Sequence, residues 1–159
     1  MTDQPFVTCL WFDTEAEAAA HYYTSIFKDS KLGRVIRSTE AGPGRAGSVL
    51  TAEFEVNGQK FVGLNGGPVF KFNEAISFQI MCKDQAEVDY YWSKLTEQGE
   101  AVECGWLKDR YGLFWQVVPT VLLDMISDPD QEKAGRATKA MLSMKKLDIA
   151  ALQKAYVGE

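Results

Sequence analysis

Residues 47–67, GSVLTAEFEVNGQKFVGLNGG, have the pattern of a β-hairpin. Between Val49 and Val56 apolar and more polar positions alternate, and the apolar set is Leu50, Ala52, Phe54 and Val56. A period of two predicts a strand with one buried face. Asn57-Gly58 follows directly, and this pair favours the positive φ angles of a two-residue hairpin turn. We therefore expect QKFVGLNGG to be the return strand.

The residues before this hairpin predict a strand, a helix and a further strand. PFVTCLWFD, residues 5–13, is rich in β-branched and aromatic residues, as strands are. EAEAAAHYYTSIF, residues 15–27, has apolar residues at helical spacing, and Asp13 or Thr14 is expected to cap this helix. KLGRVIRSTE, residues 31–40, reads as a strand. The predicted order is therefore βαβββ.

The same order returns in the second half of the chain. AISFQIMC, residues 75–82, predicts a strand, and KDQAEVDYYWSKLTEQG, residues 83–99, predicts a helix that Gly99 ends. EAVECGWLKD (100–109) and LFWQVVP (113–119) each read as one strand. The fold class expected is thus α+β, with paired βαβββ modules.

We expect a single domain, 1–159, that consists of a first module, 5–68, a second, shortened module, 75–119, and C-terminal helices, 120–157. Ser127 or Asp128 is expected to start one of these helices, and Asp148 the last. An apolar stripe runs along them, comprising Met141, Met144, Leu147 and Leu152. This stripe either packs on the sheet or mediates dimerisation.

Composition and charge limit the classes of partner. The net charge of −5 argues against nucleic acid, because binding its backbone requires clustered Lys and Arg. No apolar stretch is long enough for a membrane helix, and the N-terminus does not resemble a signal peptide. The three cysteines form no C-x-x-C pair. We expect a cytoplasmic protein that binds neither nucleic acid nor membrane.

Three segments form a specific set: LNGGP (64–68), FNEAISF (72–78) and CGWLKD (104–109). With these segments the chain resembles, from Phe6 to about Tyr156, the demethylubiquinone methyltransferase-like, or PhnB-like, family. That family belongs to the vicinal-oxygen-chelate superfamily, which includes glyoxalase and bleomycin-resistance proteins. The resemblance implies paired βαβββ modules whose sheets curl around a shared cavity. It also implies that a homodimer commonly completes this cavity.

The resemblance also implies where a metal would be held, because the superfamily usually places four His, Glu or Gln ligands on the cavity strands. The matching positions are Gln116 and Ser77 in the second module, and Asn65 and Thr8 (or Phe6) in the first. Asn65 is assigned by internal symmetry, since it precedes Pro68 by three residues as Gln116 precedes Pro119. Transition metals prefer imidazole, carboxylate or thiolate ligands, so these amides and hydroxyls predict no intrinsic metal and no cofactor.

The resulting hypothesis is a homodimer that binds a small aromatic or amphipathic metabolite without a metal. The predicted ligand-binding residues are Thr8, Asn65, Ser77, Gln79, Trp106 and Gln116. The alternative is an enzyme: a metal-assisted lyase, isomerase or dioxygenase, or a quinone-related methyltransferase as the family name suggests. Against the last reading, LNGGP leads into another strand, whereas a doubly wound methyltransferase has a helix after its glycine-rich turn.

Other side chains have both a chemical and a structural interpretation. His21 is a general base or a surface residue of the first helix. Asp13 and Asp84 are a catalytic pair or two helix caps. Cys104 is a nucleophile or a packed thiol, and the second interpretation is favoured because no histidine or basic cluster lies near it in sequence.

Residues 42–47, GPGRAG, match the G-x-G-x-x-G pattern of dinucleotide-binding loops. Such loops lead from a strand into a helix, whereas here a strand is predicted on each side. We therefore interpret the glycines as a flexible connection with positive φ, in which Arg45 is the only charge.

Lys108 and Arg110 either bind a ligand anion at the rim or are solvated.

Overall fold

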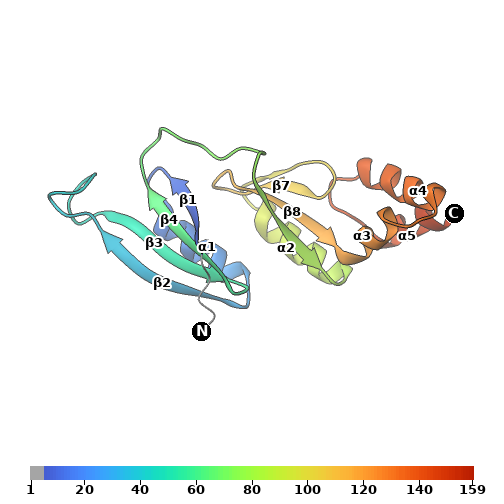
Figure 1. The fold of residues 1–159 in the computed structure, drawn as a ribbon, viewed down its shortest axis with the longest axis horizontal. Helices are drawn as coiled ribbons and strands as arrows, with labels where there is room; N and C mark the ends of the chain where they lie inside the picture. The colour runs from blue at the N-terminus through green and yellow to red at the C-terminus, as the bar shows by residue number, and fades with distance from the viewer. Residues whose placement is uncertain (1–5) are drawn as a thin grey trace. The chain divides into compact units, whose positions relative to one another are not determined.

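A computed structural model describes residues 6–159, which group into two compact units that divide between Lys71 and Phe72 (Figure 1). Each unit contains one four-stranded sheet. Residue 5, where the first strand and module were predicted to begin, lies outside the described residues. The paired βαβββ architecture with a helical C-terminal extension is confirmed.

The first unit has the element order β1, α1, β2, β3, β4, with bounds Thr8–Phe12, Ala16–Ile26, Ser30–Arg37, Val49–Val56 and Gln59–Asn65. The strand order in the sheet is β1-β4-β3-β2. β1 pairs in parallel with β4, whereas the pairs β2/β3 and β3/β4 are antiparallel. The parallel pair forms because α1 returns the chain to the far side of the sheet.

The β3–β4 hairpin has the predicted turn and the predicted buried face. Asn57 and Gly58 have φ of 49° and 78°, and Val56 is the register partner of Gln59. Phe54 stacks on Tyr23 of α1 with ring centroids 5.7 Å apart. Both rings are buried, and burying such a side chain contributes about 1.5–3 kcal/mol. The apolar alternation of β3 thus places the core between sheet and helix.

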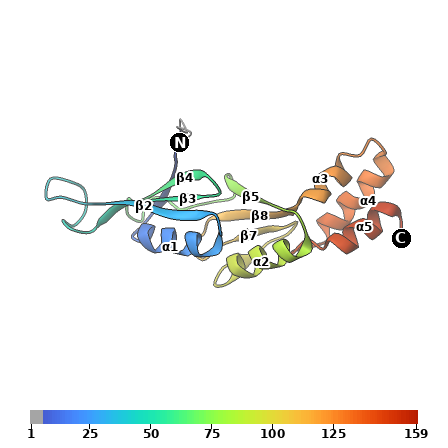
Figure 2. The same cartoon turned by 90° about the horizontal axis from the view of Figure 1, so that it is seen from below.

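The connection between β2 and β3 contains GPGRAG and extends beyond the other loops of its unit (Figures 1 and 2). Gly44 and Gly47 have φ of 80° and 84°, which confirms the predicted positive φ. The backbone N–H of Gly47 donates to the Ser38 carbonyl at 2.8 Å, and the Ser38 hydroxyl donates to the Pro43 carbonyl at 2.8 Å. A strand follows, so the phosphate-binding arrangement at a helix N-terminus is absent from this loop.

The predicted cap of α1 was wrong. The N-cap residue is Glu15, and no side chain of the cap position bonds the first turn. Instead, the Asn65 side chain, at the end of β4, accepts a hydrogen bond from the backbone N–H of Ala16 at 2.8 Å. The amide of a distant strand thus satisfies a donor that a local Asp or Thr was expected to satisfy.

The second unit repeats the order with β5, α2, β6, β7 and β8, with bounds Ser77–Cys82, Gln85–Thr96, Glu100–Ala101, Trp106–Lys108 and Phe114–Pro119. Its strand order is β5-β8-β7-β6, which matches that of the first sheet. The prediction of one strand over residues 100–109 was wrong, because a turn divides it into β6 and β7. Cys104 and Gly105, with φ of 58° and 81°, are left-handed and interrupt the extended backbone.

α2 begins as predicted and ends differently. Asp84 accepts from the backbone N–H of Glu87 at 2.9 Å, which confirms it as a helix cap. At the other end the left-handed residue is Gln98, with φ of 61°, and not Gly99. A Cβ at Gly99 would overlap the backbone oxygen of Lys108. The glycine is therefore required for close approach to β7.

Three helices follow β8: α3 (Thr120–Ile126), α4 (Gln131–Leu142) and α5 (Ile149–Val157). Asp148 caps α5 as predicted, whereas Asp130, not Ser127 or Asp128, caps α4. The three helices lie together beyond the end of β8 (Figure 2) and share a buried cluster with that strand, comprising Val118, Leu122, Met125, Ala137, Leu147 and Leu152. The predicted stripe thus packs within the unit. Among residues 6–159, no helix has the length and apolar composition that crossing a bilayer requires.

Candidate functional site

The second sheet has one face covered by α2 and one face that no helix of its own module covers. Leu107 and Val117 are fully buried on the covered side, where α2 contributes Val88 and Leu95. Side chains alternate along each strand, so the residues between them point the other way. We call this other side the second open face; it carries Ser77, Gln79, Met81, Trp106, Lys108, Phe114 and Gln116.

A chain of neutral polar groups crosses the second open face. Gln79, Gln116 and Trp106 are register partners on three adjacent strands. Gln79 Nε2 donates to Gln116 Oε1 at 3.2 Å, and Gln116 Nε2 donates to Ser77 Oγ at 2.8 Å. The structure therefore brings together four of the six predicted ligand-binding residues. We call the three linked side chains the Ser77–Gln116–Gln79 chain.

The charge at the edge of this face is neutralised locally. Lys108 Nζ lies 2.8 Å from Glu100 Oε2 on the neighbouring strand. The hydrogen bond between them raises the pKa of Lys108 above its ordinary value and lowers that of Glu100. Both side chains remain ionised and paired near neutral pH. The second open face therefore presents neutral donors and acceptors beside a balanced ion pair.

Asp109 holds the turn that sets the register of β7 and β8. Its carboxylate is buried and accepts from the backbone N–H groups of Tyr111 at 2.8 Å and Leu113 at 3.1 Å. It also accepts from Trp115 Nε1 at 2.9 Å. Trp115 points to the covered side of the sheet, where Asp109 holds its indole. Because side chains alternate along a strand, its neighbour Gln116 points to the opposite side. Sequence reasoning missed Asp109.

The first unit does not repeat the site. Thr8 and Asn65 point to the same side of the sheet as Leu10 and Phe12, which face α1 and are buried. The amide of Asn65 is engaged there, since its Oδ1 accepts from Ala16 and its Nδ2 donates to the Val49 carbonyl at 3.0 Å. The structure therefore does not place Thr8 or Asn65 on a face equivalent to that of Gln116.

The symmetry argument for Asn65 was wrong because the two prolines are not equivalent. The last register pair of the first sheet is Phe12 with Asn65, and that of the second is Cys82 with Pro119. Asn65 thus corresponds to Pro119. Aligned from these ends, the counterparts of Gln79 and Gln116 are Cys9 and Val62.

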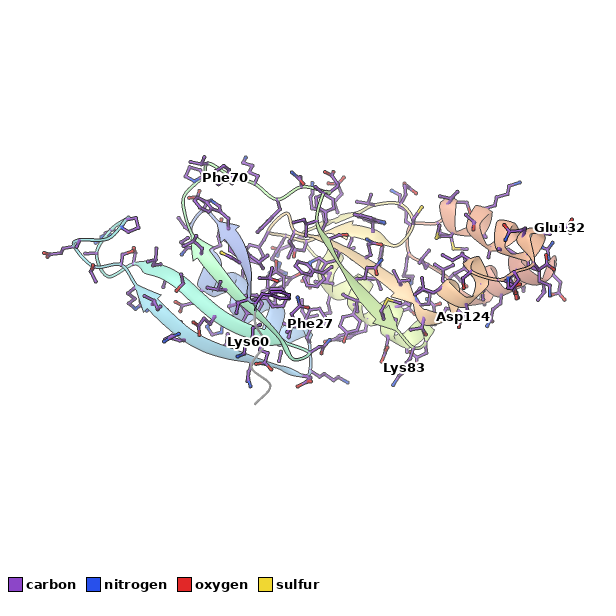
Figure 3. The ribbon with its side chains drawn as sticks, viewed as in Figure 1. Phe27, Lys60, Phe70, Lys83, Asp124 and Glu132 are labelled. Atoms are coloured by element: carbon purple, nitrogen blue, oxygen red, sulfur yellow. The ribbon has the colours of Figure 1, made fainter. Side chains whose placement is uncertain are left out.

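Trp11 occupies the open face of the first sheet together with the LNGGP segment. Its Nε1 donates to the Gly67 carbonyl at 2.9 Å, and a Cβ at Gly66 would overlap its ring. Phe70, labelled in Figure 3, meets the same ring edge-on at a centroid distance of 4.9 Å. The glycines therefore allow the backbone to pass over an indole, which is a structural use.

The same sheet has a shallow hollow of about 420 Å³, and its lining includes Lys60, which Figure 3 labels. Its charged lining is largely paired, since Arg34 lies 3.0 Å from Glu53 and Lys31 lies 3.3 Å from Glu55. The hollow therefore differs in chemistry from the neutral second open face.

The remaining candidates, His21 and Cys104, are not among the residues of the second open face. His21 is exposed on α1, and Cys104 is half-buried in the turn before β7. Burial, with smaller contributions from Glu87 and Asp84, raises the pKa of the Cys82 thiol to about 12. A thiol with such a pKa is a poor nucleophile at neutral pH.

The side chains of the second open face do not fit a divalent transition metal. Within residues 6–159, no group of three or more His, Cys, Asp or Glu side chains is placed to hold a metal ion. Ser77, Gln79 and Gln116 are uncharged, and the oxygens of Ser77 and Gln116 already accept hydrogen bonds. Neutral amide and hydroxyl oxygens do not supply the negative charge that these ions require.

Phe114 and Met81 were not predicted, although their positions could have been. Each lies two residues from a predicted residue on the same strand, Phe114 from Gln116 and Met81 from Gln79. Strand alternation alone places such pairs on one face. Phe114 is largely buried and Met81 is exposed, so Met81 supplies accessible apolar surface beside the amides.

Residues 4–118 match the family model described as 3-demethylubiquinone-9 3-methyltransferase. A PhnB protein of Bacillus cereus with the same description is 33% identical, with a TM-score of 0.67 over 74% of this chain and 100% of that one. Protein PA1353 of Pseudomonas aeruginosa (17% identity, TM-score 0.59, 74% and 98% covered) has the same fold. A fosfomycin resistance protein, FosX, of Listeria monocytogenes also has this fold, with 17% identity and a TM-score of 0.54 over 80% of this chain and 100% of that one. No curated protein matches the chain.

Proposed function

Since the chain belongs to the 3-demethylubiquinone-9 3-methyltransferase family, the PhnB-like branch of the vicinal-oxygen-chelate superfamily, we propose that it binds a small, neutral, aromatic or amphipathic metabolite on the second open face. Binding requires no resident metal. The single observation that carries the proposal is the Ser77–Gln116–Gln79 chain of uncharged groups beside Trp106.

The composition of the second open face supports this choice of ligand. Small-molecule sites combine apolar and aromatic surface with a few polar groups that fix orientation. Trp106 supplies the aromatic surface, and the chain supplies the polar groups. An ionised ligand would lose hydration there without meeting an unpaired opposite charge, because Glu100 already neutralises Lys108.

Methyl transfer of the doubly wound kind is not supported by the arrangement of the strands. That chemistry uses a glycine-rich turn between a parallel strand and a helix. Here the glycines after β4 pack over Trp11, and the next regular element is strand β5. We therefore carry over the fold of the family and not the reaction in its description.

The absence of a resident metal is tested by measuring how much metal the protein retains after dialysis. The purified protein is equilibrated in turn with zinc, nickel, manganese and ferrous ions, dialysed, and analysed for bound metal. We expect substoichiometric retention that is the same for wild type and Gln116→Ala. Stoichiometric metal that is lost in Gln116→Ala would contradict the proposal, and Asn65→Asp serves as a control substitution outside the second open face.

The ligand part is tested with a library of neutral and charged aromatic fragments. Binding is followed through the side-chain NH₂ signals of Gln79 and Gln116 and the indole signal of Trp106 in ¹H–¹⁵N spectra. We expect the hits to be neutral and to move these signals together. Hits that are all anions, or that move only signals of the first unit, would contradict the proposal.

We further propose that the protein acts as a homodimer, as the superfamily commonly does. Three large apolar side chains in the segment that joins the two modules support an intermolecular contact, namely Val69, Phe70 and Ile76, which are 62–74% exposed. Sedimentation of wild type and Ile76→Asp tests it, because a charge at a buried contact weakens association. A wild-type monomer at micromolar concentration would contradict the proposal.

A further inference from the structure

The Ser77–Gln116–Gln79 chain has a direction. Gln79 donates to Gln116, and Gln116 donates to Ser77. Ser77 Oγ has accepted a hydrogen bond and keeps its own proton to donate, whereas Gln79 Oε1 keeps its lone pairs. Within residues 6–159, neither of these two groups has a hydrogen-bond partner. One end of the chain therefore offers a donor and the other an acceptor.

The two ends belong to residues of one strand. Ser77 and Gln79 lie two residues apart on β5, which separates their Cα positions by roughly 6.6 Å along the strand. A carbonyl and a hydroxyl on opposite sides of a six-membered ring span a comparable distance. Gln116 lies between Gln79 and Trp106 in the register, so a ring above Gln116 has the indole at its side.

We propose that the second open face selects a neutral aromatic ring that carries a carbonyl oxygen directed at Ser77 and, on the opposite side of the ring, a hydroxyl directed at Gln79. This inference rests on the proposed function and specifies the polarity of its ligand. The Ser77 hydroxyl donates to the carbonyl. Gln79 Oε1 accepts from the ligand hydroxyl.

The neutral second open face also sets a preference against the matching anion. A carboxylate in place of the carbonyl would meet the neutral Ser77 hydroxyl, and Lys108 is already paired with Glu100 at 2.8 Å. Its loss of hydration would not be offset by an opposite charge. A ligand with a ketone is therefore bound more tightly than the corresponding carboxylate.

The experiment uses four probes of similar size and the complete protein. 4-Hydroxyacetophenone has both groups, 4-methoxyacetophenone lacks the donor, 4-ethylphenol lacks the carbonyl, and 4-hydroxybenzoate is the anion. Dissociation constants are measured near neutral pH from the Gln116 side-chain NH₂ shifts. We expect 4-hydroxyacetophenone to bind about fivefold more tightly than either neutral probe that lacks one group, since each lost hydrogen bond costs about 1 kcal/mol. 4-Hydroxybenzoate is expected to bind most weakly.

Two substitutions test which end of the chain is the donor and which is the acceptor. Ser77→Ala is expected to abolish the preference for the carbonyl and keep that for the hydroxyl, and Gln79→Leu is expected to do the reverse. Ser77→Thr, which keeps the hydroxyl, is the matched control, and equal melting temperatures establish that the variants are folded. The opposite assignment would mean that the chain runs in the other direction and would overturn the inference.

The remaining outcomes separate this inference from the proposed function. If the three neutral probes bind equally, the polarity is overturned and the neutral binding site stands. If 4-hydroxybenzoate binds most tightly, the inference is overturned and so is the neutral character of the site. If no probe shifts the Gln116 signal at millimolar concentration, both proposals are overturned.

Discussion

The two units share one strand order and differ in what the equivalent strands carry. At corresponding places the first sheet has Cys9 and Val62, whereas the second has Gln79 and Gln116. The polar amide of the first unit, Asn65, lies on the opposite side of its sheet and caps α1. The difference teaches that the same topology accommodates an amide as a structural cap in one unit and as an accessible polar group in the other.

The comparison also separates two kinds of hydrogen bond. Asn65 and Asp109 satisfy backbone donors that would otherwise be buried without partners. The Ser77–Gln116–Gln79 chain connects side chains only with one another. Removing the first kind exposes the full cost of an unsatisfied buried group, whereas removing the second kind changes mainly the chemistry of a surface.

The largest expected difference concerns the thiols on the first strand of each unit. Cys9 is exposed, whereas the pKa of the buried Cys82 is raised to about 12 from an ordinary value of 9.0. The thiolate is the reactive species, so Cys82 should react on the order of a thousandfold more slowly than a free thiol. Iodoacetamide labelling followed by peptide mass spectrometry measures both sites. Labelling of Cys82 in the folded protein at the rate of Cys9 would contradict its burial.

The stability of the folded protein also has a predicted pH dependence at Cys82. The pKa of this thiol is higher in the folded state than its ordinary value of 9.0, so its contribution to stability is fully present below pH 9.0. That contribution is lost as the pH rises towards about 12. Cys82→Ala should therefore show a weaker loss of stability over this alkaline range. Equal alkaline slopes for wild type and Cys82→Ala would show that the thiol does not titrate abnormally.

The next effect is the loss of the buried carboxylate that fixes the β7–β8 turn. Asp109→Ala leaves three donors without their acceptor and should lower the free energy of unfolding by about 3 kcal/mol. Asp109→Asn keeps one acceptor oxygen and should cost less. Urea denaturation measures both. A change below about 1 kcal/mol for Asp109→Ala would contradict the role assigned to this turn.

A smaller effect distinguishes the two amides directly. Asn65→Ala removes the cap of α1 and the bond to Val49, and should cost about 1–2 kcal/mol of unfolding free energy. Gln116→Ala should cost less than about 0.5 kcal/mol, as is usual for a substitution outside the core. Asn65→Asp keeps the accepting oxygen and is the matched control. Equal losses in the two alanine variants would remove the distinction between the units.

The smallest effect is expected at the glycine-rich loop. Arg45 contributes its backbone carbonyl to the turn, where it accepts from Ser48, and its side chain is exposed. Arg45→Ala should change neither the melting temperature nor the affinity for neutral fragments. A weaker affinity would assign the loop a part in binding.

The sequence predicted what short-range pattern determines. The alternation of β3 and the Asn57-Gly58 turn were enough for the hairpin, and the repeated element order was enough for the paired modules. The caps at Asp84 and Asp148 follow from residue type next to a helix. Four of the six predicted ligand-binding residues lie together because they belong to adjacent strands with known alternation.

What the sequence did not predict depends on contacts between distant residues. The donor of Ala16 is satisfied by Asn65, forty-nine positions away, so the local search for a cap at Asp13 or Thr14 failed. The assignment of Asn65 to the cavity relied on its distance from a proline, yet Pro119 ends a strand and Pro68 lies beyond one. The burial of Asp109 likewise depends on how the hairpin closes.

The most direct test of the central claim compares one ligand across equivalent positions of the two units. The dissociation constant of 4-hydroxyacetophenone is measured from the Trp106 indole shift for wild type, for Gln116→Leu and for Cys9→Ser, with melting temperatures as the folding control. We predict that Gln116→Leu weakens binding at least about tenfold, because the chain loses both of its hydrogen bonds, and that Cys9→Ser leaves it unchanged. Unchanged binding in Gln116→Leu, or an equal loss in Cys9→Ser, would contradict the assignment of the ligand to the second open face.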